Sequence, residues 1–186
     1  MKKVEHGKTF DRNAANPPAF EIFHNTVTEG YPEHWHTAIE IIMPTRGEYE
    51  VVVGKDSYNL KEGDIIMINS GVVHGMRFVS QGERIVMLVE PGCVENQEEM
   101  ETIFLRLPAI YFKKEDEEDP FYLFLRSQIL ELVREYDNEG AVMTHRICTG
   151  LKELFSEFGR KGFSDANAQN TFGAMKQQEY IEAVLS

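Results

Sequence analysis

The sequence is poor in cysteine and has no long hydrophobic run. Its 186 residues include two cysteines, Cys93 and Cys148, which are far apart in the sequence and do not form a C-x-x-C pair. We interpret them as free thiols of a reducing compartment rather than as a disulfide. No apolar run approaches the roughly 20 residues that a membrane-spanning helix needs. Residues 1–16 lack the apolar segment of a signal peptide. We therefore expect a cytoplasmic protein without a membrane partner.

Basic residues are scarce relative to acidic ones. The chain has 19 Lys and Arg against 31 Asp and Glu, which gives a formal net charge of −12. A strongly acidic surface repels the phosphate backbone of nucleic acids. These residues are therefore not expected to grip DNA or RNA themselves, although a basic module in the same protein could do so.

Short strands are the main feature of the first half. The apolar fraction of 42% and the aromatic fraction of 11% are enough to build a core. Between residues 19 and 92, short apolar segments alternate with turns rich in Gly, Asn, Asp and Ser, a pattern typical of an all-β sandwich or barrel. The expected strands are 19–24, 36–43 (ended by Pro44), 48–53, 57–60, 65–69, 72–79 and 84–90.

The pattern changes to a helical period after Pro91-Gly92. A short helix is expected at 97–107, and a charged loop at 113–119. Asp119-Pro120 is typical of a helix N-cap followed by proline in the first turn. Longer helices are expected at 120–136 and 141–158, and their short connection predicts an antiparallel pair.

The helix pair has broad apolar surfaces, through which we expect a homodimer. The alternative is that the two helices cover an open face of the barrel, since amphipathic stripes most often pack within one chain. The side chains assigned to dimerisation are Phe121, Leu125, Leu132, Leu151, Leu154, Phe155 and Phe158.

The chain divides into five regions on this basis. A polar arm (1–18) precedes the barrel (19–92) and a helical dimerisation region (93–162). A small polar linker follows at 163–172. Residues 173–186 begin another helix that has no following segment to pack against. We expect this helix to be the start of a truncated DNA-binding domain.

One segment carries a candidate metal site. In His34-Trp35-His36-Thr37-Ala38-Ile39-Glu40, positions 34, 36 and 40 differ by even numbers, so on a strand their side chains share one face. His74, on a later strand, would complete the set. Imidazole and carboxylate ligands suit Zn, Mn, Fe, Ni or Co. The alternative is a hydrogen-bonded pocket without metal. His6, His24 and His145 are interpreted as surface or capping residues.

These residues resemble the two cupin signatures. The first, G…HxH(x)3–4E(x)6G, is met by His34, His36, Glu40 and Gly47. The second, G(x)5PxG(x)2H(x)3N, is met by Gly63, Gly71 and His74, with Asn69 in place of the proline and Phe78 in place of the asparagine. The resemblance implies a mainly β fold with an α appendage. This fold is a double-stranded β-helix (cupin or jelly-roll) barrel followed by the antiparallel helix pair.

The order of arm, barrel, helix pair and linker resembles the N-terminal half of an AraC-type transcription regulator. It ends on a helix start that contains Tyr180-Ile181-Glu182. The resemblance implies that the barrel senses a small-molecule effector, held by His34, His36, Glu40 and His74. It also implies that DNA is bound only through a missing C-terminal helix-turn-helix module, and that the chain is not an enzyme. The alternative is a small metal-dependent cupin enzyme of the dioxygenase or isomerase type, and the fold alone does not decide between them.

Overall fold

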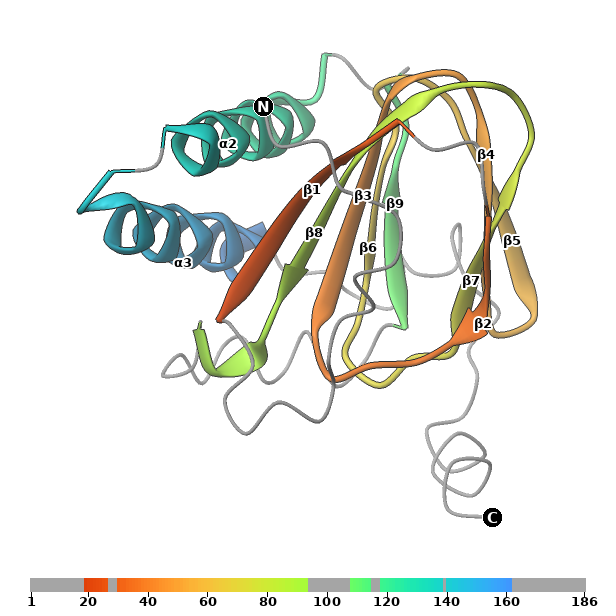
Figure 1. Cartoon of the computed structure of the whole chain (residues 1–186), viewed down its shortest axis with the longest axis horizontal. Coiled ribbons are helices and arrows are strands. Elements are labelled where there is room, and N and C mark those ends of the chain that lie inside the picture. Colours follow the sequence, from red (N-terminus) through yellow and green to blue (C-terminus); the bar gives the residue numbers. More distant parts are fainter. Residues whose placement is uncertain (1–18, 27–29, 94–107, 115–117, 139, 162–186) are drawn as a thin grey trace.

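The computed structural model describes residues 19–26, 30–93, 108–114, 118–138 and 140–161. Within the described residues, nine strands are followed by two long helices (Figure 1). The elements are β1 (Phe20–Asn25), β2 (Tyr31–His34), β3 (Ile39–Arg46), β4 (Tyr49–Val53), β5 (Asp56–Leu60), β6 (Ile65–Ile68), β7 (His74–Phe78), β8 (Glu83–Val89), the 3₁₀ turn η1 (Pro91–Cys93), β9 (Ala109–Phe112), α2 (Pro120–Asp137) and α3 (Met143–Lys161).

The strands form two antiparallel sheets. The larger sheet has the order β1-β8-β3-β6-β9, and the smaller one has the order β2-β7-β4-β5. Neighbours in space are mostly distant in sequence, as in β1 with β8 and β4 with β7. The structure therefore confirms the predicted fold class, a double-stranded β-helix barrel followed by a helix pair.

The inner core lies between the two sheets. Alternate residues of β4, Tyr49, Val51 and Val53, are buried against Ile66 and Ile68 of β6. Because successive side chains of a strand point to opposite faces, the intervening residues Glu50 and Val52 are only half-buried. The hydrophobic alternation read from the sequence thus sets which side of each strand faces inward.

A second core lies outside the barrel, between the larger sheet and the helices. Figure 1 shows α2 and α3 side by side along this sheet. Ile39, Ile41 and Met43 of β3 belong to the same buried cluster as the apolar stripes of both helices. The buried helix residues are Tyr122, Leu125, Ile129, Leu132, Ile147, Leu151, Leu154, Phe155 and Phe158.

This layer includes six of the seven side chains assigned to dimerisation, and Phe121, half-buried, packs against it. Their packing within one chain is what the alternative interpretation expects, namely helices that cover a face of the barrel. A homodimer stays a prediction. Because Leu125, Leu132, Leu151, Leu154, Phe155 and Phe158 are at most 3% exposed, such a contact would have to use other side chains.

Two strands differ from the sequence prediction. The strand expected at 36–43 instead spans Ile39–Arg46 and runs through Pro44. Proline lacks an N–H donor, but the pairing of β3 with β8 is irregular between Pro44 and Arg46, and the Pro44 carbonyl accepts from Gly63 N at 2.9 Å. A proline is tolerated at such an irregularity. The second strand, β2, was not predicted, because its sequence YPEH lacks an apolar alternation.

The barrel also extends beyond the boundary expected at residue 92. Strand β9 pairs antiparallel with β6, from Ile65 opposite Phe112 to Ile68 opposite Ala109. It lies within residues 93–162, for which the sequence predicts a helical region. The arm, the helix expected at 97–107, the linker and the helix start at 173–186 all lie outside the described residues.

The first helix of the pair begins as predicted. Asp119 is the N-cap of α2, where its carboxylate accepts from Phe121 N at 2.8 Å, and Pro120 follows in the first turn.

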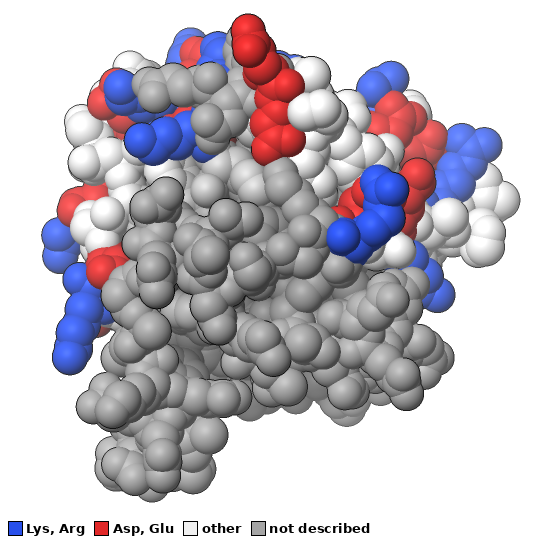
Figure 2. Space-filling model, turned by 180° about the vertical axis from the view of Figure 1, so that it is seen from behind, with Lys and Arg blue, Asp and Glu red and all other residues white. Residues whose placement is uncertain are grey.

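No described helix is long and apolar enough to cross a membrane. Figure 2 shows acidic and basic side chains interleaved along the edges of one face. Ion pairs at the surface include Arg77–Glu50 and Arg146–Glu135.

Candidate metal centre

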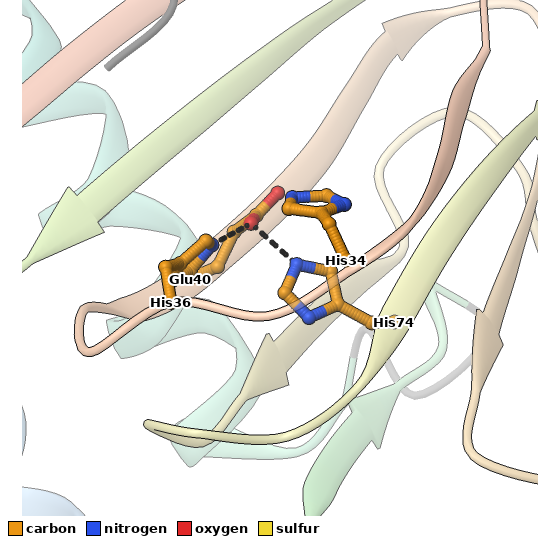
Figure 3. Close-up of side chains that lie close together, drawn as sticks. All are labelled: His34, His36, Glu40 and His74. Atoms are coloured by element: carbon orange, nitrogen blue, oxygen red, sulfur yellow. Dashed lines mark hydrogen bonds and ion pairs between the residues drawn. The ribbon is translucent and has the colours of Figure 1, made fainter. Parts of the chain in front are cut away.

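The four predicted ligands come from three strands and from the segment that joins two of them. His34 ends β2, His36 lies in the bend before β3, Glu40 is the second residue of β3, and His74 begins β7. The structure therefore brings all four together (Figure 3). The reason differs from the predicted one, because His34, His36 and Glu40 do not share one strand. Between His34 and Ile39 the chain crosses from the smaller sheet to the larger one.

Strand register sets where each side chain lies. His34 is directly opposite His74 in the pairing of β2 with β7. Glu40 pairs with Leu88 and Ile68 in the larger sheet. The position of His36 depends on the bend, where its carbonyl accepts from Gly71 N at 2.8 Å. The cluster therefore bridges the two sheets from the inside.

One carboxylate oxygen is the centre of the cluster. His36 Nε2 and His74 Nε2 each lie 2.9 Å from Glu40 Oε2 (Figure 3). The rings of His34 and His74 are 4.5 Å apart between centroids. Taking one ligand atom from each of the four residues, all of them lie within 4.8 Å of one another. Four donor atoms thus face a common point.

The second ring nitrogen of each histidine faces a backbone carbonyl. His34 Nδ1 is 2.9 Å from the Pro32 carbonyl, His36 Nδ1 is 2.9 Å from that of Ala38, and His74 Nδ1 is 2.8 Å from that of Val72. A carbonyl only accepts, so each Nδ1 must carry the proton. In this neutral tautomer each Nε2 carries no proton and presents a lone pair. Metal-binding histidines are oriented by the same kind of N–H to carbonyl bond.

This tautomer makes the cluster incomplete without a cation. Nε2 lone pairs at 2.9 Å from a carboxylate oxygen repel it, unless a metal ion or protons on the imidazoles compensate. Metal–ligand bonds of about 2.1 Å place neighbouring ligands about 3.0 Å apart at right angles and about 3.4 Å apart in a tetrahedron. The observed 2.9 Å contacts are close to the separation of two ligand atoms that share one metal ion. The residues present therefore fit a divalent transition metal.

Burial and charge prepare the groups for that role. Burial alone would raise the pKa of the Glu40 carboxyl, but when His36 and His74 carry a proton on Nε2, their hydrogen bonds and charges hold that pKa at about 2. Burial also lowers the pKa of His34, an effect that its bond to the Pro32 carbonyl opposes and the charge of His74 reinforces. At neutral pH the cluster therefore offers an ionised carboxylate and, at His34, a neutral imidazole.

Residues between the ligands hold the loops in place. Gly71 has φ +75° at the turn before His74, a conformation that favours glycine. Gly47, the last position of the first signature, has φ +79°, and a Cβ there would lie 2.7 Å from the Gln81 carbonyl oxygen. Thr37 Oγ1 donates to the Glu90 carboxylate at 3.2 Å. The signature spacing identified these glycines, but no sequence pattern pointed to Thr37 or to the three orienting carbonyls.

A cavity of about 400 Å³ lies at a different place, at the start of β6. It is open and polar, and none of the four ligands lines it. Its buried acid, Asp64, accepts from Tyr111 Oη at 2.6 Å, Lys114 N at 2.8 Å and Lys61 N at 2.9 Å. These bonds account for Asp64 as a structural tie between β6 and β9, and no sequence motif predicts a functional role for this region.

Comparisons with known proteins agree with the barrel fold. A cupin domain model matches residues 25–90, whereas no curated protein matches the sequence. An apo ToxT variant from Vibrio cholerae shares the fold with a TM-score of 0.51, at 11% identity over 78% of this chain and 58% of its own. An oxalate decarboxylase mutant from Bacillus subtilis has a TM-score of 0.36, 18% identity and coverage of 39% and 21%. A conserved Streptococcus pyogenes protein of unknown function has a TM-score of 0.35 and 18% identity, and the match covers 39% of this chain and 63% of that protein.

The chain thus spans less than two thirds of each of these three proteins. The match to the domain model begins within β1 and ends directly after β8, so it contains all four ligands and both signatures. Residues 25–90 of this chain therefore have the cupin fold.

Proposed function

We propose that this chain is the effector-sensing and dimerisation part of an AraC-type transcription regulator, in which His34, His36, Glu40 and His74 hold a divalent metal. The observation that carries the proposal is that the two faces of the larger sheet have different contacts. The helix pair is packed on the outer face, and the polar cluster is enclosed on the inner face. A ligand bound inside would thus act on the same sheet that supports the helices.

The extent of the shared fold supports this proposal. The likeness to ToxT covers 78% of the chain, which is more than the barrel strands alone contain. The net charge of −12 argues that DNA is contacted by another module rather than by these residues. Control of DNA binding would then depend on how the helix layer is positioned.

A bound metal would supply a Lewis-acidic anchor for an oxygen atom of the effector. His34, His36, Glu40 and His74 would occupy four positions, which leaves one or two for water or effector in five- or six-coordinate geometry. His34 is the least buried of the four. The three carbonyls of Pro32, Ala38 and Val72 would hold the imidazole rings in the ligating tautomer.

A metal-dependent cupin enzyme is the second candidate function. The observation in its favour is the same cluster, because four protein ligands with remaining open positions suit substrate activation as well as ligand holding. The helix layer favours the regulator, since it adds nothing to the ligand set.

Metal content tests the shared part of both candidates. Protein purified without chelator is expected to hold about one transition-metal ion per chain by elemental analysis. His36→Ala is expected to abolish it, because it removes one ligand and a partner of Glu40. His145→Ala is the matched control, since His145 is exposed on α3 outside the cluster. Metal-free wild-type protein that remains metal-free after incubation with Mn²⁺, Fe²⁺ or Zn²⁺ would contradict the metal assignment.

The fate of a bound compound separates a sensor from an enzyme. A thermal-shift screen of sugars, aromatics and carboxylic acids with metal-loaded protein is expected to find a compound that raises the melting temperature. Recovery of that compound unchanged, at one per chain, supports the sensor. Multiple turnovers per chain would establish the enzyme instead.

The dimerisation role has its own test. Sedimentation at micromolar concentration is expected to give a dimer, and a monomer would contradict the dimerisation role.

A further inference from the structure

Cys93 and Cys148 lie in contact, although 55 residues separate them in the sequence. Their Sγ atoms are 3.4 Å apart. Cys93 ends η1, directly beyond the last residues of β8, whereas Cys148 lies on α3. We infer that this pair is a reversible disulfide site that cross-links the barrel to the helix layer. This inference stands apart from the proposed function, because neither cysteine belongs to the ligand cluster.

The geometry needs little change for the bond to form. A disulfide has an S–S distance of about 2.05 Å, so the sulfurs would have to approach by about 1.4 Å. Both side chains are half-buried and pack against the core beneath the helices, which keeps them adjacent while leaving them accessible to a small reagent. The chain contains only these two cysteines, so no other thiol competes for either one.

A small-molecule disulfide such as oxidised glutathione is a sufficient oxidant. Burial and the neighbouring Cys148 raise the pKa of Cys93 to about 12, and only a thiolate attacks well. One of the two thiols would lose its proton and attack the glutathione disulfide, expelling one glutathione thiolate and forming a mixed disulfide. The second thiol would then lose its proton and attack the protein sulfur of that mixed disulfide, expelling the second glutathione. The protein loses two electrons and two protons, and one glutathione disulfide becomes two thiols.

The cross-link would restrain the helix layer on the sheet. Cys93 is tied to the barrel end by its N–H, which donates to the Glu90 carbonyl at 2.9 Å. The closed loop would contain β9 and α2. These elements would therefore stay covalently linked to the barrel at both ends of the loop, even when they unfold. Closing a loop of this length restricts the unfolded chain and is expected to raise the melting temperature by on the order of 10 °C.

Redox titration of the whole chain tests the inference. Reduced protein is equilibrated with glutathione buffers of increasing oxidised fraction, quenched in acid, alkylated with N-ethylmaleimide and weighed intact. Both alkylation sites are expected to disappear together, without added glutathione mass, and peptide mapping should join the Cys93 and Cys148 peptides. Cys93→Ser and Cys148→Ser are each expected to retain a single thiol that forms only the mixed glutathione disulfide.

Two results would overturn the inference. One is a wild-type chain that keeps both thiols, or accumulates only mixed disulfides, in a large excess of oxidised glutathione. The other is a cross-link between two chains in dilute protein on a non-reducing gel. The oxidised chain should also melt about 10 °C higher than the reduced one, whereas the same treatment should not move the melting temperature of the double variant Cys93→Ala/Cys148→Ala.

Discussion

The two faces of β3 differ in what holds them. On the outer face, Ile39, Ile41 and Met43 are at most 2% exposed and pack under the helices. On the inner face, Glu40 Oε2 lies 2.9 Å from two imidazole nitrogens, and the next inward residue, Ile42, joins the apolar barrel core. One strand therefore supports a non-directional hydrophobic contact on one side and a directional polar site on the other.

This difference has energetic consequences. Burial of apolar area contributes roughly 25 cal/mol per Å² and depends little on exact geometry. A buried carboxylate instead costs free energy unless its partners are in place. Mutations on the outer face should thus change stability and spare the chemistry, whereas changes at Glu40 or its histidines should alter ligand binding first.

The largest expected effect breaks the outer face alone. Phe155→Ala removes a fully buried ring of α3, and we expect the free energy of unfolding to fall by about 3–5 kcal/mol. Urea denaturation measures the loss, and the folded variant should keep its metal content. Leu123→Ala is the control, because Leu123 is 50% exposed on α2 and should change stability by about 0.5 kcal/mol at most. A loss below about 1 kcal/mol for Phe155→Ala would mean that this layer contributes little.

Acidification should act on the inner face alone. Because the pKa of Glu40 is held at about 2, its carboxylate stays ionised in mild acid. Metal binding requires deprotonated imidazoles, so protons compete with the cation for the histidine ligands as the pH falls. Metal affinity measured by competition with a chromogenic chelator should therefore fall at least tenfold between about pH 7.5 and pH 5.5, a free-energy change of about 1.4 kcal/mol or more.

The same titration has an internal control. Glu40→Gln should weaken metal binding at every pH, because it removes the negative ligand, yet it should keep the loss on acidification, because the histidines remain. A wild-type affinity that stays constant down to about pH 5 would show that these imidazoles are not the metal ligands.

The smallest expected effect concerns the start of the helix layer. Asp119→Ala removes the oxygen that accepts from Phe121 N at 2.8 Å, and loss of such an N-cap costs about 1 kcal/mol. Thermal and urea unfolding should both detect the change. Glu118→Ala is the matched control, since Glu118 is exposed one residue earlier and should be neutral within about 0.5 kcal/mol. Equal losses for the two variants would assign the effect to general charge instead of to capping.

Much of the fold could be predicted because its signals are local. The alternation of Tyr49, Val51 and Val53 marks an inward face, Asp119-Pro120 marks a helix start, and the signature spacing selects the four ligands. Strands β2 and β9 could not be predicted in the same way. Tyr31–His34 has no buried residue, and Ala109–Phe112 becomes a strand through its pairing with β6.

The sequence by itself determined which residues face inward and which four donors belong together, since side-chain period and motif spacing are properties of the chain. Only the tertiary structure decided how those donors meet. A bend between the two sheets and the register of β2 with β7 bring His34, His36 and Glu40 to His74, although they do not share one strand. The same is true of Cys93 and Cys148, interpreted from their spacing as separate thiols and placed 3.4 Å apart by the packing of α3 near η1. Contacts between distant segments depend on how layers pack, and no local pattern records that packing.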